Sequence, residues 1–500
     1  MSKPPFKYRL PVLSLPGIAV LLVLACALAG RARAEEKPAG PPQAAAAPTK
    51  DGALFERVLQ LHLVQEPELD LTATRQEFDK LVAQARAALA NAATPREKVV
   101  TLNKVLLADR NVSYLSNKYW RDSTLAASLL RRQGNCLATT TLYVLAGHAL
   151  DLPIRMVLVP RHAFARWDDG QTRINIETTA KGAEFSDSDY FSRWSQPSPL
   201  DIEKLGWGRS LDDTGVYAEL LVAAAYHRAG ESRLEDALKL FDQALELRPH
   251  RTDTVLHRYE TVANIAGRRN EARDKIIGML NDQKTRPLPP SVEVGALSFL
   301  AHDAAGAGDH QRERAFLMMA FARAPKASQL GILTELAFCL RALKDYRGAV
   351  RYMELAVALQ PDNDGLLYNL AILQKNDGRL KDALATIAAA RRLNPESWNL
   401  QMIEAGYQVL DGQREKGLEL YAKIERPRGD VEFYDIMQAW FHAVSQQREG
   451  FYKHFEYALS HARSTSILEW IDQDVDLDVY RNENEFKALV EKHRARLLEK

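Results

Sequence analysis

Three side chains in the first half of the sequence have the types and the order that nucleophilic acyl transfer requires: Cys136, His162 and Glu177. Cys136 directly follows Gly134 and Asn135, at the predicted N-terminus of the apolar helix CLATTTLYVLAGHAL. The unpaired N–H groups and the dipole at a helix N-terminus stabilise a thiolate, which is the nucleophilic form of cysteine. The position of Cys136 therefore predicts a reactive thiol.

His162 and Glu177 fall in two predicted strands that a tight turn joins. His162 opens the segment HAFARW, Glu177 lies in RINIETT, and the turn between them is centred near Asp169 and Gly170. Residues opposite each other on adjacent antiparallel strands lie about 5 Å apart, so a carboxylate can orient an imidazole there. The sequence thus predicts a catalytic triad in which Cys136 is the nucleophile, His162 the general base and acid, and Glu177 the orienting carboxylate.

Acyl transfer also needs hydrogen-bond donors for an oxyanion. The backbone N–H of Cys136 is one candidate, and the second donor is left open among Tyr119, Trp120 and Gln133, which also suit packing or loop capping. Metal chemistry has no support in the sequence, because the 12 histidines are scattered and neither an HExxH motif nor a paired-cysteine motif occurs. We expect no metal and no cofactor.

A structural interpretation competes at each of these positions. Free cysteine is among the residue types most often buried, so Cys136 could be a core residue. We prefer that interpretation for Cys339, which lies inside the repeat helix ELAFCLRAL. Glu177 could equally be a solvated charge at the end of a strand. The coincidence of cysteine, histidine and acid in this order favours the triad.

The segments around the triad change from helical to strand periodicity. From Leu54 to about Arg132 apolar residues recur at helical spacing. After the helix that begins at Cys136, the segments IRMVLVP, HAFARW and RINIET have strand character. Helices followed by antiparallel strands predict an α+β domain, which we place at residues 52–205.

The N-terminus has the features of a targeting segment. Basic residues precede a long apolar run at 10–30, and Ala32-Arg33-Ala34 then offers a small-x-small site with cleavage expected near Ala34. We predict that residues 1–34 are a signal peptide, or else a membrane anchor or a lipoprotein leader around Cys26. Residues 35–51 have the composition of a Pro/Ala-rich linker. The chain is expected to be exported, to the periplasm if the source is a Gram-negative bacterium.

The second half of the sequence has helical periodicity throughout and repeats itself. A first column of small residues stands at Ala225, Ala301, Ala337, Ala371, Ala405 and Ala439. A second column follows each of these after 19 residues and is alanine in five of six cases, with Ile424 as the exception. Two antiparallel helices approach closely only where small side chains face each other. The pattern predicts a solenoid of about seven helical pairs at 216–465 and a terminal cap at 466–500. Because each repeat contacts only its neighbours, the array from about residue 214 is expected to fold by itself.

Both halves of the chain resemble known families. The order GNC…HAF…NIETT resembles the transglutaminase-like superfamily, whose papain-like fold uses a Cys-His-Asp triad. This chain departs from that pattern in having Glu177 as the acid, and Ala163-Phe164 after His162 where many active members have Trp. The strings EDALKLFDQALELRP and KDALATIAAARRLNP resemble tetratricopeptide repeats. Together the resemblances imply an α+β papain- or transglutaminase-like N-terminal domain followed by an all-α tetratricopeptide solenoid.

The net charge and the domain architecture of the chain limit the functions that it could have. The 66 basic and 65 acidic residues nearly cancel, so nucleic acid is not an expected partner. A solenoid groove usually receives a protein or peptide, so protein binding is expected. The favoured function is an exported cysteine-dependent hydrolase or acyltransferase acting on a protein or peptide amide. Protease, amidase and cross-linking transferase share one acyl-enzyme intermediate and stay open. A non-catalytic envelope scaffold and an assembly protein for surface polysaccharide or appendages are the alternatives.

Overall fold

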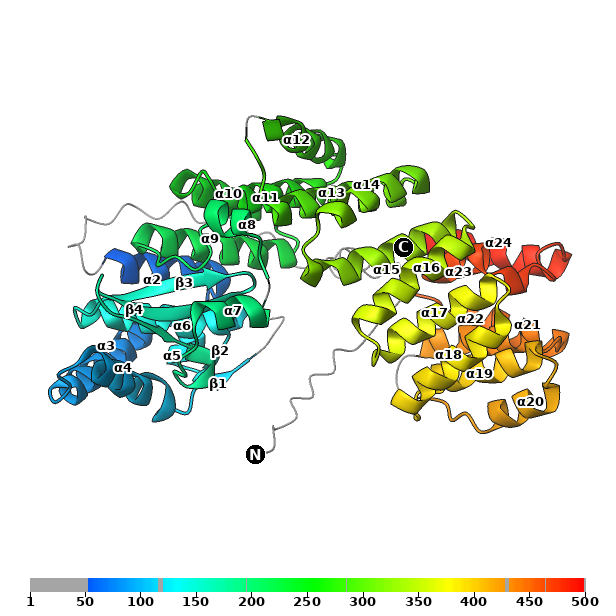
Figure 1. Ribbon diagram of the computed structural model, residues 1–500, viewed down its shortest axis with the longest axis horizontal. Coiled ribbons are helices and arrows are strands. Elements are labelled where there is room, and N and C mark those ends of the chain that lie inside the picture. The colour runs from blue at the N-terminus through cyan, green and yellow to red at the C-terminus, as the bar shows by residue number, and fades with distance from the viewer. Residues whose placement is uncertain are drawn as a thin grey trace. The chain divides into compact units, whose positions relative to one another are not determined.

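The computed structural model describes residues 53–115, 120–194, 196–284, 286–427, 431–463 and 465–498 (Figure 1). The predicted targeting segment and linker lie outside these residues. The chain divides into two compact units, of which one holds residues 53–300 and 322–327 and the other residues 301–321 and 328–498. In the part of the chain that the structure describes, no helix is both long enough and apolar enough to cross a membrane.

The first unit begins with the helices that the sequence pattern predicts. They are α2 (Ala53–Gln65), α3 (Leu71–Leu89), α4 (Pro95–Asn103), η1 (Lys104–Ala108), η2 (Trp120–Ser123) and α5 (Leu125–Leu129). Local signals fix where they start: Asp70 caps α3, and Thr94 forms a capping box with Glu97 at the start of α4. The helix α5 is shorter than the apolar pattern indicates, because the chain turns at Arg132 with a positive φ of 54°.

Two small sheets follow. One pairs β1 (Ser113–Tyr114) with β2 (Gln133–Gly134) in parallel, and the other has the antiparallel order β3 (Ile154–Val159), β4 (His162–Asp168), β5 (Arg173–Ile176). The predicted helix between them is α6 (Cys136–Ala149), and the sheet is followed by η3 (Thr178–Ala180), α7 (Asp187–Trp194) and α8 (Pro199–Leu205). In the larger sheet His162 is opposite Val159, and Ala165 is opposite both Met156 and Ile176.

Different helices cover the two faces of the three-stranded sheet. On one face Met156 and Ala165 join a buried cluster that includes Leu142 of α6. On the other face Phe164 packs with Tyr190 of α7. Because side chains alternate along a strand, each face of β4 has its own set of neighbours. The helix that carries Cys136 and the helix that carries Tyr190 are both fixed by this sheet.

The remaining described chain is helical, as the repeat pattern predicts. Its helices are α9 (Asp213–Gly230), α10 (Leu234–Leu247), α11 (Thr252–Ala263), α12 (Arg269–Asn281), η4 (Asp282–Lys284), α13 (Pro290–Gly306), α14 (His310–Arg323), η5 (Lys326–Ser328), α15 (Gln329–Ala342), α16 (Tyr346–Leu359), α17 (Asp364–Asn376), α18 (Leu380–Leu393), α19 (Trp398–Leu410), α20 (Arg414–Ala422), α21 (Val431–Val444), α22 (Arg448–His461), α23 (Ser466–Gln473), η6 (Val475–Leu477) and α24 (Asn484–Leu498). The six alanines of the first column are 0% exposed, and the five of the second column are at most 2% exposed. The exception, Ile424, is only partly buried. Small side chains therefore stand at the buried helix contacts, as expected.

The first helical pair shares its core with the α+β domain. α9 packs against α2, and Val216, Leu220 and Ala224 belong to the same buried cluster as Leu54 and Val58. A fragment that begins near residue 214 would expose this apolar side of α9 to water. The predicted domain boundary near residue 216 therefore cuts through a continuous hydrophobic core. The repeat pattern in the sequence does not indicate that α9 shares this core with α2.

Candidate active site

Cys136 begins α6, and its neighbours build the N-terminus of that helix. Asn135 is the N-cap: its Oδ1 accepts the backbone N–H groups of Leu137 and Ala138 at 3.0 and 3.1 Å. The Asn135 amide also donates to Ser123 Oγ at 2.6 Å, which ties the helix to η2. The Cys136 side chain is partly exposed. The thiol therefore stands at the positive end of the helix dipole and within reach of solvent.

Gly134 is needed because the chain passes close to two other segments at this point. A Cβ on Gly134 would lie 2.9 Å from the Cβ of Ala138 and 3.3 Å from the backbone oxygen of Asp122. The same Asp122 oxygen accepts the N–H of Asn135 at 2.8 Å. The Gly-Asn pair thus holds the backbone in front of Cys136 in one position.

His162 and Glu177 are joined in the interior of the domain. His162 Nε2 lies 2.7 Å from Glu177 Oε2, and the two side chains are 2% and 1% exposed. The Cys136 side chain is close enough to the imidazole to help raise its pKa. The structure therefore brings the three predicted residues together, with a hydrogen bond between His162 and Glu177 and the Cys136 thiol beside the imidazole.

His162 and Glu177 each shift the pKa of the other toward its charged form. Burial lowers the pKa of His162, but its interactions with Cys136 and Glu177 raise it to about 9. Burial raises the pKa of Glu177, but the His162 imidazolium and hydrogen bonds from Thr179 bring it below its ordinary value. At neutral pH the base is therefore an imidazolium that faces a carboxylate.

Glu177 differs from its predicted position in one respect. β5 ends at Ile176, and Glu177 is the N-cap of η3, with its N–H donating to the oxygen of Ala183 at 2.8 Å. Its Oε1 accepts the N–H of Thr179 at 2.9 Å. The carboxylate therefore reaches His162 from a turn just beyond the strand and not from a cross-strand pair.

Three threonines tie α6 to the residues beside the base and the acid. The Oγ1 atoms of Thr139 and Thr140 lie 2.9 and 3.1 Å from Oγ1 of Thr178, which directly follows the acid. Thr140 also donates to the oxygen of Ala163, next to His162, at 3.3 Å. The sequence analysis missed these contacts. The signal was the TTT run in an otherwise apolar helix, because buried hydroxyl groups need hydrogen-bond partners.

A further residue that the sequence analysis missed, Tyr190 of α7, covers the base. Its ring is 0% exposed and stacks on His162 and Phe164, with centroids 6.0 and 3.7 Å apart. Its hydroxyl lies near the Glu177 carboxylate, whose charge acts on it. Burial and the Glu177 charge raise the pKa of Tyr190, so the hydroxyl keeps its proton. Tyr190 therefore contacts both the base and the acid.

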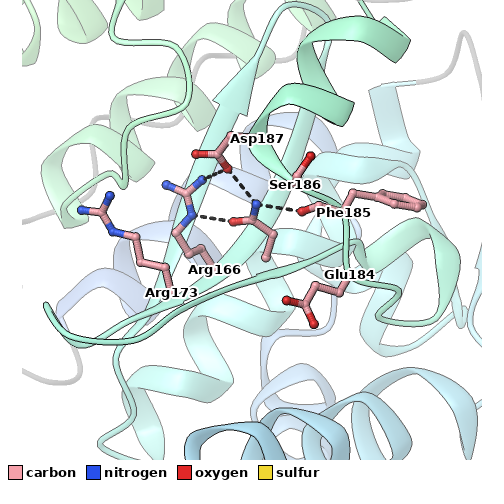
Figure 2. Close-up of a pocket in the computed structure, with 7 residues that line it drawn as sticks. Arg166, Arg173, Glu184, Phe185, Ser186 and Asp187 are labelled. Carbon is pink, nitrogen blue, oxygen red and sulfur yellow. Dashed lines mark hydrogen bonds and ion pairs between the residues drawn. The ribbon is translucent and has the colours of Figure 1, made fainter.

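A polar network holds α7 in this place (Figure 2). The buried Arg166 of β4 forms an ion pair with Asp187, the first residue of α7, and donates to Asn175 Oδ1 at 2.6 Å. Asn175 in turn donates to Asp187 Oδ1 at 2.7 Å and to the oxygen of Phe185 at 2.9 Å. Arg166 stands four residues after His162 on the same strand. The network therefore fixes the start of α7 relative to the base.

The same network lines an open hollow of about 430 Å³. Its lining residues are Arg166, Arg173, Asn175, Glu184, Phe185, Ser186 and Asp187. Cys136, His162 and Glu177 are not among them. The hollow is therefore separate from the three residues of the candidate triad.

Comparison with protein families agrees with both halves of the architecture. A family model described as Transglutaminase-like superfamily matches residues 72–203, which include Cys136, His162 and Glu177. A second model, described as Tetratricopeptide repeat, matches residues 340–405. The chain carries a transglutaminase-like domain followed by tetratricopeptide repeats. No curated protein is significantly similar to it in sequence.

Solved structures similar to the chain are tetratricopeptide repeat proteins of low sequence identity. YrrB, a TPR protein with an unusual peptide-binding site, is 16% identical with a TM-score of 0.27, over 46% of this chain and 91% of YrrB. PilW, a type IV pilus biogenesis factor, is 14% identical with a TM-score of 0.34, over 43% of this chain and 97% of PilW. A repeat protein from Parabacteroides merdae is 14% identical with a TM-score of 0.37, over 51% of this chain and 98% of its own. Similarity at these TM-scores supports no conclusion about function.

Two substitutions of Tyr190 test whether this residue positions the base of the transglutaminase-like domain. Tyr190→Phe keeps the ring stack on His162 and removes only the hydroxyl, so Cys136 should still react with a thiol-directed electrophile at about the wild-type rate. Tyr190→Leu removes the aromatic contact with His162, which is worth about 0.5–1.5 kcal/mol, so labelling should slow about two- to tenfold. Mass spectrometry of the labelled protein measures the rate. A Tyr190→Leu protein that folds and is labelled at the wild-type rate would exclude the positioning role.

Cys339, in the tetratricopeptide region, is the buried thiol that the sequence analysis predicts. It is 2% exposed, and its thiol donates to the oxygen of His310 at 3.2 Å. Burial, together with the nearby Glu313 carboxylate, raises the pKa of Cys339 to about 12. Such a thiol stays protonated and is a poor nucleophile. It offers an internal reference for the reactivity of Cys136.

The candidates for a second oxyanion donor lie near the thiol in sequence. Gln133 is in β2, three residues before Cys136, and Trp120 begins η2, whose Ser123 contacts the N-cap of α6. Tyr119 lies outside the described residues. Among the residues that the structure describes, no group of three or more His, Cys, Asp or Glu side chains is arranged to hold a metal ion.

Proposed function

We propose that the chain is an exported cysteine-dependent acyl-transfer enzyme that acts on a protein or peptide amide, and that its solenoid recruits the substrate or a partner protein. One observation carries the proposal. A partly exposed thiol at a helix N-terminus stands beside a buried histidine, whose imidazole Nε2 lies 2.7 Å from an oxygen of a buried carboxylate. That arrangement supplies a nucleophile, a proton carrier and an orienting acid in contact with one another.

The residues act in two steps. The Cys136 thiolate attacks the amide carbonyl carbon, and the backbone N–H of Cys136 donates to the oxyanion that forms. The His162 imidazolium then gives its proton to the leaving amine as the C–N bond breaks, which leaves an acyl thioester on Cys136. Water or a second amine attacks the thioester, His162 takes the proton from this nucleophile, and the thiolate leaves.

The choice between water and an amine separates hydrolysis from cross-linking, and the triad serves both. Glu177 keeps its charge throughout and stabilises the imidazolium each time it forms. Because the carboxylate also accepts the backbone N–H of Thr179, the imidazole has a fixed orientation in both steps. Protease, amidase and transglutaminase-like activities are therefore all compatible with this site.

The export part of the proposal rests on sequence features. Basic residues, an apolar run and a small-residue cleavage site stand in order within residues 1–34. The recruiting role rests on the solenoid, whose stacked pairs offer an extended surface of the kind that binds a peptide or a helix. A periplasmic or membrane-anchored enzyme with its own substrate-binding array fits these features together.

Selective labelling of the full chain tests the proposal. Iodoacetamide at low concentration and near-neutral pH should modify Cys136 and leave Cys339 intact, because the first thiol is partly exposed beside an imidazolium and the second is buried and protonated. Peptide mapping by mass spectrometry identifies the modified residue. If Cys136 reacts no faster than an unperturbed thiol, the domain is a binding module and the chain a non-catalytic envelope scaffold.

A further inference from the structure

A short acidic segment near the C-terminus reaches back across the solenoid. Asp476 of η6 forms an ion pair with Lys375 at the end of α17 and accepts the indole N–H of Trp440, in α21, at 2.8 Å. Lys375 and Asp476 are 101 residues apart in sequence, and their side chains are 11% and 13% exposed. α17, α19 and α21 are the first helices of three successive pairs. The segment therefore lies on the side of the solenoid that its first helices form.

Trp440 is seated against α19 by a glycine. A Cβ on Gly406 would lie 2.3 Å from the Trp440 ring, so the indole can lie against this helix only where the side chain is missing. Tyr407 meets the same ring edge-on, with centroids 6.2 Å apart. We call the surface made by Lys375, Gly406, Tyr407 and Trp440 the first-helix face. It offers a cation and an indole N–H, which are the two donors that bind Asp476.

The charges of this region are complementary. Acidic residues alternate in the stretch DQDVDLD at 472–478, which includes Asp474 and Asp476. On the solenoid, Arg341 and Lys375 stand at equivalent positions of successive repeats, 34 residues apart. The charges of Arg341 and Asp474 both act on the buried Tyr368, which places them on the same side of the array.

The docked segment is not an apolar plug. Leu477 is 0% exposed and packs among the last helices, as a terminal cap requires. Asp474 and Asp476 are different: burial and the charge of Asp476 raise the pKa of Asp474 to about 6, so the two carboxylates oppose each other where they are held. Buried ion pairs add specificity more than stability. Asp476 is therefore the carboxylate that binds the basic surface, while Asp474 accepts the Trp470 indole N–H and the backbone N–H of Asp476 within its own segment.

We propose that residues 474–476 are an internal ligand of the solenoid, and that an acidic segment of a partner protein binds the first-helix face by displacing them. The proposal rests on the recruiting role proposed above and names the chemistry of the recruited partner. The internal segment and the partner protein would then compete for the same face. A tethered segment competes at an effective concentration in the millimolar range, so only a well-matched or multivalent acidic partner displaces it.

A peptide of residues 470–481 with a fluorescent label tests the proposal by anisotropy on the full-length chain. Wild-type protein should bind the peptide weakly, because its own copy occupies the face. Asp476→Asn removes the charge that pairs with Lys375, so the peptide should bind about tenfold more tightly or better. Adding Lys375→Met to that variant removes the receptor cation and should abolish the gain.

Asp478→Asn is the matched control, because Asp478 belongs to the same segment but is 64% exposed and pairs with Arg481 instead. It should bind the peptide as weakly as wild type. Equal binding by wild type and Asp476→Asn, or a gain that survives Lys375→Met, overturns the proposal. The rate of Cys136 labelling in the same variants reports separately on acyl transfer, so a failure of one proposal does not imply failure of the other.

Hydrogen exchange on the wild-type chain tests the proposal without the Asp476→Asn variant, which could fail to fold. The amides of 474–476 should exchange faster than those of α17 and α21, because the segment leaves the face without unfolding the repeats. Excess unlabelled peptide should speed their exchange further. Exchange of this segment only together with both helices would show a fixed cap and overturn the proposal.

Discussion

Replacing Cys136 with serine should abolish electrophile labelling at this position and lower any acyl-transfer rate by about 10³-fold or more, while the free energy of unfolding changes by less than about 0.5 kcal/mol. The thiol is partly exposed at the start of α6, so little packing is lost. A serine hydroxyl can still hydrogen-bond to His162, but it is not ionised at neutral pH. Mass spectrometry and thermal unfolding measure the two effects.

The opposite pattern identifies a structural cysteine. If Cys136 were a core residue, its replacement by a hydroxyl without a partner would cost about 1–3 kcal/mol and no reactivity would be lost. Cys339→Ala is the control: it removes the buried thiol of α15 and should leave the labelling of Cys136 unchanged. Loss of Cys136 labelling in the Cys339→Ala protein would show that the measurement follows folding and not the site.

Replacing His162 with alanine should move the labelling of Cys136 to higher pH. In the wild type the pKa of His162 is about 9, so an imidazolium stands beside the thiol through neutral pH and favours the thiolate. Without it, labelling should rise only near the value of about 8.5 that is typical of a free thiol. Glu177→Gln should shift the profile less and in the same direction, because the imidazole keeps a hydrogen-bond partner but loses the charge that stabilises its protonated form. The pH profile of the labelling rate decides between these outcomes.

The same substitution has a stability counterpart. The pKa of His162 rises from 6.5 to about 9 on folding, so the native state holds this proton more tightly than the unfolded chain does. The resulting stabilisation is fully present below pH 6.5 and is lost as the pH rises through about 9. The difference in stability between wild type and His162→Ala should shrink over that interval in chemical denaturation. If neither His162→Ala nor Glu177→Gln changes the pH profile of labelling or of stability, the enzymatic proposal is wrong. The non-catalytic scaffold is then the remaining function.

The parts of the structure that depend on local pattern follow from the sequence. The order of helices and strands around Cys136 and His162 comes from a change of apolar period, and the burial of Ala337 and Ala371 comes from a spacing that recurs along the array. The approach of the thiol to the imidazole could be inferred because a helix N-terminus and a strand start are both marked by nearby residues. The contact between His162 and Glu177 was predicted from strand pairing, and it occurs through the turn after β5 instead.

The parts that depend on distant contacts do not follow from the sequence. Tyr190 lies beyond the sheet, in a short helix without a motif, and it reaches His162 only because Arg166 and Asp187 fix that helix. Asp476 lies in a stretch that breaks the repeat pattern, and nothing in its neighbourhood indicates Lys375 as its partner. Side-chain periodicity tells which face of an element is buried, but not which element covers it.

The core shared by α2 and α9 sets an order for folding during synthesis. Leu54 and Val58 leave the ribosome well before Val216 and Leu220, which help to bury them. A nascent chain that stops before residue 216 therefore holds all three triad residues but an unfinished core, with apolar surface open to chaperones. The transglutaminase-like domain completes its core only when the first repeat has been made, so the domain cannot finish folding before synthesis of the repeat array has begun.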